Sequence, residues 1–243
     1  MIKGALMLAA AVLVAGCNSG PSQTADNAVG GATIVSTAQT PKATATTSLS
    51  LDWGKKAQAG QVAIADVLSY GGPKVTITPP ASWQLIRNDS TPTTRQSLYW
   101  HTIQANEPST ATWTFSQPVD AQGAIVLLDN VAAGGPVDVA VGNTGSGGTV
   151  TAKGITTTAD GDLILSFFAT DFGNPGLLGS SPQIPADTKM VVNQQAAPFE
   201  YWILQSYQSQ NGSTADQVIN VAQLFNWVAT QVGIKKNATA SSQ

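Results

Sequence analysis

The sequence predicts an all-β protein, a single antiparallel β-sandwich of jelly-roll-like type. Residues 111–115 (ATWTF) strictly alternate apolar and hydroxyl side chains, which is the pattern of a strand with one buried face. Residues 124–128 (AIVLL) are apolar throughout, as expected for a strand covered on both faces. Residues 98–103 form a further β-rich run, and the turn-rich residues 104–109 allow it to lie antiparallel to 111–115. The three runs therefore predict a meander of neighbouring strands.

Turn signals divide the rest of the chain into further short strands. The segments with a strand pattern are residues 32–36, 43–51, 61–69, 74–78, 83–87, 137–141, 149–157, 163–170, 189–194 and 200–208. Asp160-Gly161 stands between two of these runs and predicts a tight β-hairpin. Residues 142–148 are rich in glycine and are predicted to be a loop. They lack the following helix that a phosphate-binding loop requires.

The final apolar segment, residues 216–235, fits two structures. Its apolar residues recur at helical spacing over 218–232, whereas residues 227–235 alternate as in a strand. Because every other element is predicted to be β, we favour two strands at 218–223 and 227–235. A helix at 216–226 is the alternative.

Composition bounds both the organisation and the partners of the chain. With 243 residues, 42% of them apolar, it can bury the core of one large domain, which we place at residues 32–236. Only 10% of residues are charged, and the net charge of −3 offers no basic surface for nucleic acid. The single cysteine, Cys17, excludes an intrachain disulfide. No cofactor is expected.

The N-terminus has the pattern of a secretory signal, with Lys3 followed by an apolar run at residues 5–15. That run is too short to span a bilayer, which takes about 20 apolar residues. Residues 13–17, Leu-Val-Ala-Gly-Cys, closely resemble the lipobox of bacterial lipoproteins. The resemblance implies a signal peptide at 1–16 and acylation of Cys17, for example with palmitate, which would anchor the chain to membrane lipid. An ordinary signal peptide with an unmodified cysteine is the alternative.

Two further features concern the ends of the chain. Asn18 stands where enterobacterial lipoproteins retained in the inner membrane carry an aspartate, so the resemblance favours the outer membrane or the cell surface. Residues 17–31 are small and polar and are predicted to form a flexible tether after the lipidated cysteine. Residues 237–243 are predicted to be a disordered tail.

The body of the chain also resembles a known group of domains. The segments GQVAIADVLSYGG (60–72), GAIVLLDNVAAGGPVDVAVG (123–142) and WVATQVGIKK (227–236) are similar to a β-sandwich domain of secreted and surface proteins of bacteria and of phage-associated proteins. The resemblance covers nearly the whole chain after the tether. It implies an extracytoplasmic β-sandwich and brings no shared catalytic centre.

Few residues could carry acid–base chemistry. His101 is the only histidine, and no G-x-S-x-G motif accompanies it, so we interpret it as a structural or surface residue. Five aspartates lie at predicted turns, where such residues usually bind nearby backbone; they are Asp129, Asp138, Asp160, Asp162 and Asp171. A hydrolase that uses His101 or paired aspartates is an alternative function. Calcium at Asp160 and Asp162, or at Asp171 with Asn174, is a weaker reading, and we predict no metal site.

Aromatic residues suggest a second alternative, a carbohydrate-binding module, because ring faces stack on sugars. Most rings are expected to fill the core. The candidates for ligand stacking are Trp53, Tyr99, Tyr201, Trp202 and Tyr207. The sequence as a whole predicts a membrane-anchored lipoprotein whose sandwich acts without catalysis as a binding, adhesion or structural module. A glycan or a surface protein is the expected partner.

Overall fold

The computed structural model describes residues 31–171, 182–196 and 199–238, apart from the side chains of residues 196 and 222–225. Its strands are β1 (Thr33–Gln39), β2 (Ala43–Asp52), β3 (Val62–Tyr70), β4 (Ile77–Thr78), β5 (Gln84–Ser90), β6 (Thr94–Thr102), β7 (Thr110–Asp129), β8 (Val137–Ala152), β9 (Thr156–Thr157), β10 (Asp162–Asp171), β11 (Lys189–Ala196), β12 (Phe199–Gln208), β13 (Gly212–Ser213) and β14 (Gln217–Ile234). A short 3₁₀ helix, η1 (Gly72–Lys74), follows β3. The predicted all-β fold is confirmed.

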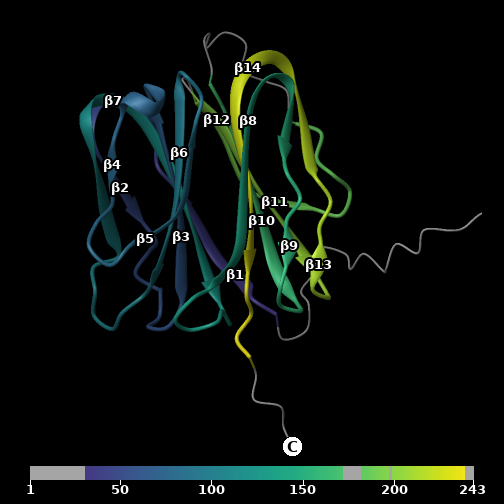
Figure 1. Ribbon diagram of the computed structural model, residues 1–243. Coiled ribbons are helices and arrows are strands. Elements are labelled where there is room, and N and C mark those ends of the chain that lie inside the picture. Colours follow the sequence, from purple (N-terminus) through teal and green to yellow (C-terminus); the bar gives the residue numbers. More distant parts are fainter. Residues whose placement is uncertain (1–30, 172–181, 197–198, 239–243) are drawn as a thin grey trace, which may run out of the picture.

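Two large antiparallel sheets pack face to face (Figure 1). The first has seven strands, all from residues 33–129, in the order β1-β7-β3-β6-β5, with β2 and β4 paired to β7. The second has five strands, all from residues 137–234, in the order β11-β12-β10-β14-β8. Each sheet is therefore one contiguous half of the chain, so the strands do not pass back and forth between the sheets as they do in a jelly roll.

The two halves of the chain follow the same path. In the first half, β3 is central, pairs with β6 and β7, and is followed outward by β5 next to β6. In the second half, β10 is central, pairs with β12 and β14, and is followed outward by β11 next to β12. The long strand β8 lies along β14 as β1 and β2 together lie along β7. The sandwich is thus two copies of one topology placed face to face.

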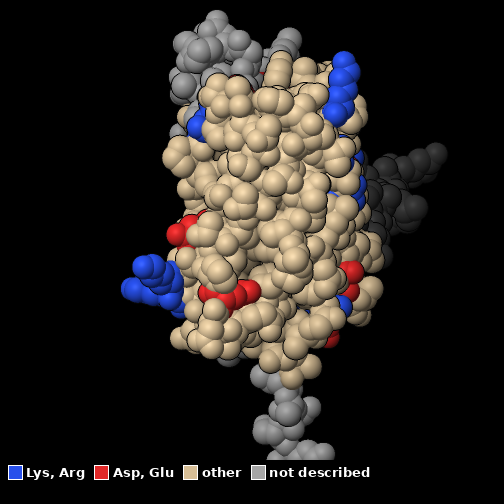
Figure 2. All heavy atoms as spheres, turned by 90° about the vertical axis from the view of Figure 1, so that its left-hand side faces the viewer, with Lys and Arg blue, Asp and Glu red and all other residues tan. Residues whose placement is uncertain are grey.

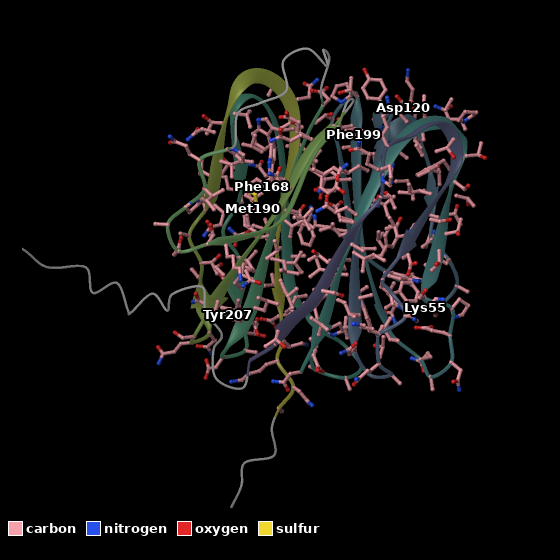
Figure 3. All side chains as sticks on the ribbon, turned by 180° about the vertical axis from the view of Figure 1, so that it is seen from behind. Lys55, Asp120, Phe168, Met190, Phe199 and Tyr207 are labelled. Atoms are coloured by element: carbon pink, nitrogen blue, oxygen red, sulfur yellow. The ribbon has the colours of Figure 1, made fainter. Side chains whose placement is uncertain are left out.

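The long strands, β7 in the first sheet and β8 and β14 in the second, bend at the upper end of the molecule (Figure 1). The parts beyond these bends form an outer layer on each sheet. The central core between the sheets includes Ile64 and Val126 from one sheet and Phe167 and Ile203 from the other. A second core lies beneath the first half of β7, β2 and β4 and contains Trp113. A third lies on the outer side of the second sheet, where Phe168 and Met190 pack, as Figure 3 shows.

Glycines allow the close approach of these layers. A Cβ on Gly123 in β7 would lie 2.7 Å from the carbonyl oxygen of Asp66 and 3.1 Å from a methyl of Leu49. A Cβ on Gly145 in β8 would lie 2.3 Å from the ring of Trp227. Residues 142–148 are part of β8 and pair with β14, so the prediction of a loop there is wrong. Two of their glycines, Gly142 and Gly145, meet close neighbours within the strand's packing.

Three other predicted connections are also wrong. Residues 111–115 and 124–128 belong to one strand, β7, and β6 pairs with β3 and β5, so the predicted meander does not form. Asp160-Gly161 makes a tight turn, with Gly161 at φ 77°, but it joins β9 to β10, which pair with other strands. Residues 217–234 are one strand, β14, which confirms β structure over the helical alternative and merges the two predicted strands.

Both ends of the described chain lie at the lower end of the sandwich in Figure 1. The side-chain amide of Asn130 donates to the carbonyl of Gly31 at 2.9 Å, next to the start of β1. The backbone N–H of Asn237 donates to the carbonyl of Asn130 at 2.8 Å, just beyond the end of β14. Figure 3 shows Lys55 and Tyr207 at this lower end, and Asp120 and Phe199 at the upper one.

Candidate functional site

The outer layer formed by β2, β4 and the first half of β7 presents a face of hydroxyl side chains. Along these strands, core residues alternate with exposed serine and threonine, because successive side chains of a strand point to opposite sides. We call the exposed set the hydroxyl face; it comprises Ser48, Ser50, Thr76, Thr78, Thr110, Thr112, Thr114 and Ser116. Threonine is well suited to these positions because its branched side chain favours extended backbone.

Strand pairing arranges the hydroxyl face in rows. Thr114 of β7 lies opposite Ser48 of β2 on one side and Thr78 of β4 on the other. In the next row Ser50 lies opposite Thr112, and their hydroxyl oxygens are 2.8 Å apart. Neighbouring strands are about 4.8 Å apart and alternate residues about 6.8 Å apart, so the hydroxyl groups form a regular grid.

The hydroxyl face carries almost no charge. Figure 2 views the molecule from this side, and large parts of the surface there are formed by residues other than Lys, Arg, Asp and Glu. Asp52, opposite Thr110, is a carboxylate at the lower margin, and its Oδ1 accepts the N–H of Gly54 at 2.7 Å. Hydroxyl groups both donate and accept hydrogen bonds, so this face can bind a neutral partner that also offers both.

His101 lies on the buried side of the same half, among aromatic rings. Its Nε2 lies 2.9 and 3.0 Å from the two carboxylate oxygens of Glu107, and its Nδ1 lies 3.4 Å from the carbonyl oxygen of Ser82. Its ring stacks on Trp83 with centroids 5.2 Å apart, and Trp53 lies 6.3 Å away. Glu107 also accepts the N–H of Gln104 at 2.9 Å. The pair thereby fixes the loop between β6 and β7.

This arrangement gives His101 little access to a substrate. The residue is 3% exposed, and among the described residues no serine, threonine or tyrosine hydroxyl is hydrogen-bonded to its ring. A pocket of about 220 Å³ adjoins the pair and is lined in part by Trp53, Lys55, Asn106 and Glu107. The imidazole is not among the groups that line it.

The five aromatic residues that we proposed for ligand stacking are all buried. Tyr201 and Trp202 are 0% exposed, Tyr99 is 2%, Trp53 is 7% and Tyr207 is 9%. Tyr201 and Tyr207 also donate their hydroxyl groups to the carbonyls of Gly123 and Ala32, at 3.0 and 3.3 Å. A ring must have an open face to stack on a sugar, so the structure corrects the stacking role of these residues. They fill the cores instead.

Two of the turn aspartates bind segments distant in the sequence, and a third binds its neighbour. Asp160 accepts the N–H of Asn211 at 2.6 Å, and Asp171 accepts the N–H of Asn226 at 2.8 Å. Asp129 accepts the N–H of its neighbour Asn130. Within the described part of the chain, no three His, Cys, Asp or Glu residues are grouped as they would be around a metal ion. Asn174 lies outside the described residues.

Asp138 and Asp162 are the two aspartates that come together. Burial, followed by the nearby charge of Asp138, raises the pKa of Asp162 to about 7. Burial also acts to raise the pKa of Asp138, but hydrogen bonds from the hydroxyl and the N–H of Thr158 outweigh it, so that this pKa is lowered. Asp162 is fully buried, which leaves the pair without the open cleft that a glycosidase needs.

The predicted lipidation site, Cys17, and the tether that follows it lie outside the described residues, as do residues 239–243 of the predicted tail. Within the described ranges, no helix is long and apolar enough to cross a membrane. Comparison of the chain with protein-family models, with curated proteins and with solved structures gave no match.

Sequence reasoning assigned the binding role to aromatic rings and missed the hydroxyl positions. The alternation at residues 111–115 already separated the two sets, because it placed rings and hydroxyl groups on opposite faces of one strand. The sequence pattern does not show that this strand pairs with β2 and β4. That pairing brings residues from three parts of the chain into one grid.

Proposed function

We propose that the chain is a bacterial lipoprotein anchored through Cys17, and that its sandwich acts without catalysis as an extracytoplasmic binding, adhesion or structural module. The observation that carries the proposal is the sequence of residues 13–17, Leu-Val-Ala-Gly-Cys, at the end of a short apolar run. Two or more acyl chains on one cysteine anchor a protein stably, whereas one chain binds reversibly. The outer membrane or the cell surface is the proposed location.

The geometry of the body is compatible with such an anchor. The described chain begins at the lower end of the sandwich, so the tether would hold that end toward the membrane (Figure 1). The hydroxyl face runs along the side of the molecule and would stay accessible. A non-catalytic role is supported by His101, which is 3% exposed and held between Glu107 and Trp83.

The anchor is tested by replacing the single cysteine. Cys17→Ser removes the only sulfur that could be acylated in the lipobox, so the variant should be lost from the membrane fraction. The measurement is fractionation of bacteria that express either form, together with mass spectrometry of the N-terminal peptide for acyl chains. A variant that still sediments with membranes would refute the anchoring proposal.

A second candidate function, carbohydrate binding, is favoured by the hydroxyl face. A neutral glycan offers hydroxyl groups at regular intervals, and a rigid grid of serine and threonine can hydrogen-bond several of them at once. Each hydrogen bond contributes only about 1 kcal/mol, so appreciable affinity requires many rows to bind together. We therefore expect an extended polysaccharide to bind better than a single sugar.

The glycan proposal predicts that alanine replacements on the hydroxyl face weaken binding to polysaccharides. The variant Ser50→Ala, Thr112→Ala, Thr114→Ala removes three central hydroxyl groups and should weaken binding to insoluble neutral polysaccharides, such as cellulose and amylose, by at least about tenfold. The measurement is depletion of the protein from solution by each polymer.

The matched control lies on the outer side of the other half. Thr156 and Ser213 are exposed, and their hydroxyl oxygens are also close, at 3.1 Å, so Thr156→Ala, Ser213→Ala removes the same kind of pair. This control should retain binding. Equal loss in both variants, or no retention of the unmodified chain on any polymer, would count against the glycan candidate and would leave the anchoring test unaffected.

A further inference from the structure

The two halves of the chain meet at a seam at the lower end of the sandwich. Residues 130–136 leave β7 and pass to β8, and they run antiparallel to the residues that follow β14. Val131 forms an antiparallel bridge with Lys236, and the N–H of Ala132 donates to the carbonyl of Lys235 at 3.0 Å. The C-terminal lysines are thereby held against the linker between the halves.

A pocket of about 440 Å³ opens at this seam. It is lined on one side by the linker (residues 132–135), on another by the turn before β10, and on the third by residues after β14. The full lining is Ala132, Ala133, Gly134, Gly135, Ala159, Asp160, Lys235, Lys236 and Ala238. Small side chains keep the space open, and two of the three charged groups are cations.

Both lysines are partly buried and unpaired. Among the described residues, neither ammonium group forms an ion pair or a hydrogen bond, whereas Lys42 pairs with Asp120 at 3.0 Å and Lys153 with Asp216 at 2.8 Å. The side chain of Lys236 lies over the turn, where its Nζ would be 2.8 Å from a Cβ on Gly161. Both lysines line the pocket, so an anion bound there would be attracted by two positive charges.

The backbone of the linker adds donors to this side of the pocket. Gly134 and Gly135 have φ of 77° and 159°, and within the described chain their N–H groups make no hydrogen bond. Exposed N–H groups of successive residues in such turns are a recurring way to bind anions. A Cβ on Gly134 would meet no atom within 4 Å, so the backbone here borders open space.

Two carboxylates lie near the pocket, those of Asp160 and Asp162. Asp160 lines it, but its Oδ1 accepts the N–H of Asn211 at 2.6 Å. Asp162 is fully buried beside Asp138, and the charges of Lys235 and Lys236 act to lower its pKa, so both lysines are within electrostatic reach of its carboxyl group. The lining of the pocket thus combines two cations, Lys235 and Lys236, with one carboxylate, Asp160, and several alanines.

We propose that this pocket binds a phosphate group, with Lys235 and Lys236 as the charged ligands and the N–H groups of Gly134 and Gly135 as further donors. A phosphate has several acceptor oxygens and a charge that matches two ammonium groups. The volume exceeds that of one phosphate, and the alanines suit an organic remainder such as glycerol. The group could come from a lipid headgroup or from a soluble phosphate. The inference depends neither on the lipid anchor nor on the hydroxyl face.

The test is isothermal titration of the full chain in neutral detergent micelles with three probes: inorganic phosphate, glycerol 3-phosphate and dihexanoyl phosphatidylglycerol. The variant Lys235→Gln, Lys236→Gln should weaken binding by about tenfold or more, because charge-assisted contacts are lost. The variant Ala159→Leu fills the pocket without changing its charge and should weaken binding of the two larger probes. Thermal melting verifies that each variant is folded.

Lys55 and Lys56, two exposed lysines that adjoin in the sequence, provide the matched control. Lys55→Gln, Lys56→Gln makes the same change in net charge and should alter affinity less than twofold. Binding of the lipid alone identifies a headgroup site, and binding of the soluble probes identifies a soluble phosphate site; both support the pocket. Absence of binding by all three probes at millimolar concentration, or equal weakening in the control variant, would overturn the proposal.

Discussion

At the scale of single residues, Asp66 is the most unusual group in the central core. It points from β3 into the space between the two sheets and is 0% exposed. Its Oδ2 accepts a hydrogen bond from the side-chain amide of Gln96 at 3.0 Å, but its Oδ1 has no partner among the described residues. Burial raises the pKa of Asp66 to about 7, and the hydrogen bond from Gln96 only partly opposes this.

This raised pKa predicts that the protein loses stability as pH rises. The folded state holds the proton of Asp66 up to pH of about 7, whereas the unfolded chain releases it near its ordinary pKa of 3.8. The stabilisation is therefore complete below the unfolded pKa and is lost as pH rises through the folded one. The free energy of unfolding, measured with urea, should be smaller at about pH 8 than at about pH 5 by a few kcal/mol.

The variant Asp66→Asn identifies the source of that loss. The substitution keeps the size of the side chain and removes its titratable proton. Between about pH 5 and about pH 8, the free energy of unfolding should therefore decrease less in the variant than in the unmodified protein, by roughly 2 to 4 kcal/mol. Asp162, whose pKa is also raised to about 7, titrates over the same range and remains in both proteins. An equal fall in both would show that Asp66 is not the group responsible.

Residue type alone could not locate these groups. Asp66 follows four apolar or small residues in a run that predicts a strand, but the sequence does not show that its side lies between two sheets. The same limit explains the aromatic candidates: Tyr201 and Trp202 are neighbours on opposite faces of β12, and both faces are covered. The sequence pattern of a strand does not show whether its second face is exposed to solvent. Both faces of β12 are covered, because an outer layer packs on the side away from the first sheet.

At the scale of elements, the long bent strands were the hardest feature to predict. Gln117-Pro118 interrupts the apolar pattern of β7 and resembles the end of a strand, because proline cannot donate to a ladder. In the structure, the pairing of β7 with β2 skips from Thr114 to Val119, so Pro118 stands where no ladder bond is required. The sequence correctly predicted β structure for residues 111–115 and 124–128, but it did not predict that both belong to one continuous strand.

The glycines of β8 give a prediction at this scale. Gly145→Ala would place a Cβ 2.3 Å from the ring of Trp227, which is 6% exposed in the outer core with Phe168 and Trp202. The ring must then move, and we expect a loss of about 1 to 3 kcal/mol in the free energy of unfolding. Urea unfolding measures it, and the near-ultraviolet circular dichroism of the tryptophans should change.

Ser146→Ala is the control for this substitution because Ser146 is the next residue of β8 and its side chain is exposed. It should change the free energy of unfolding by less than about 0.5 kcal/mol. If Gly145→Ala were equally mild, the packing of Trp227 against the strand would not be what requires glycine there.

At the scale of the whole molecule, the fold class followed from the sequence, but the arrangement of the halves did not. Alternating strands and turn residues are local signals, and they identified β structure even in residues 217–234, where a helix was the alternative. The division of the chain into two copies of one path depends on which strands pair. No repeat in the residues announces it: on the side that faces the central core, β3 carries Val62, Ile64 and then the charged Asp66, whereas β10 carries Leu163, Leu165 and Phe167.

The contiguity of each sheet has a consequence for how the protein is made. All ladder partners of β3, β6 and β7 lie before residue 130, so the N-terminal half can complete its backbone pairing while the rest of the chain is still being synthesised. The apolar side of this sheet would then be exposed to solvent, and able to associate with other chains, until β10 and β12 are synthesised and pack against it. The interval between the emergence of residue 130 and that of residue 208 is thus the period in which the newborn chain is most exposed to aggregation.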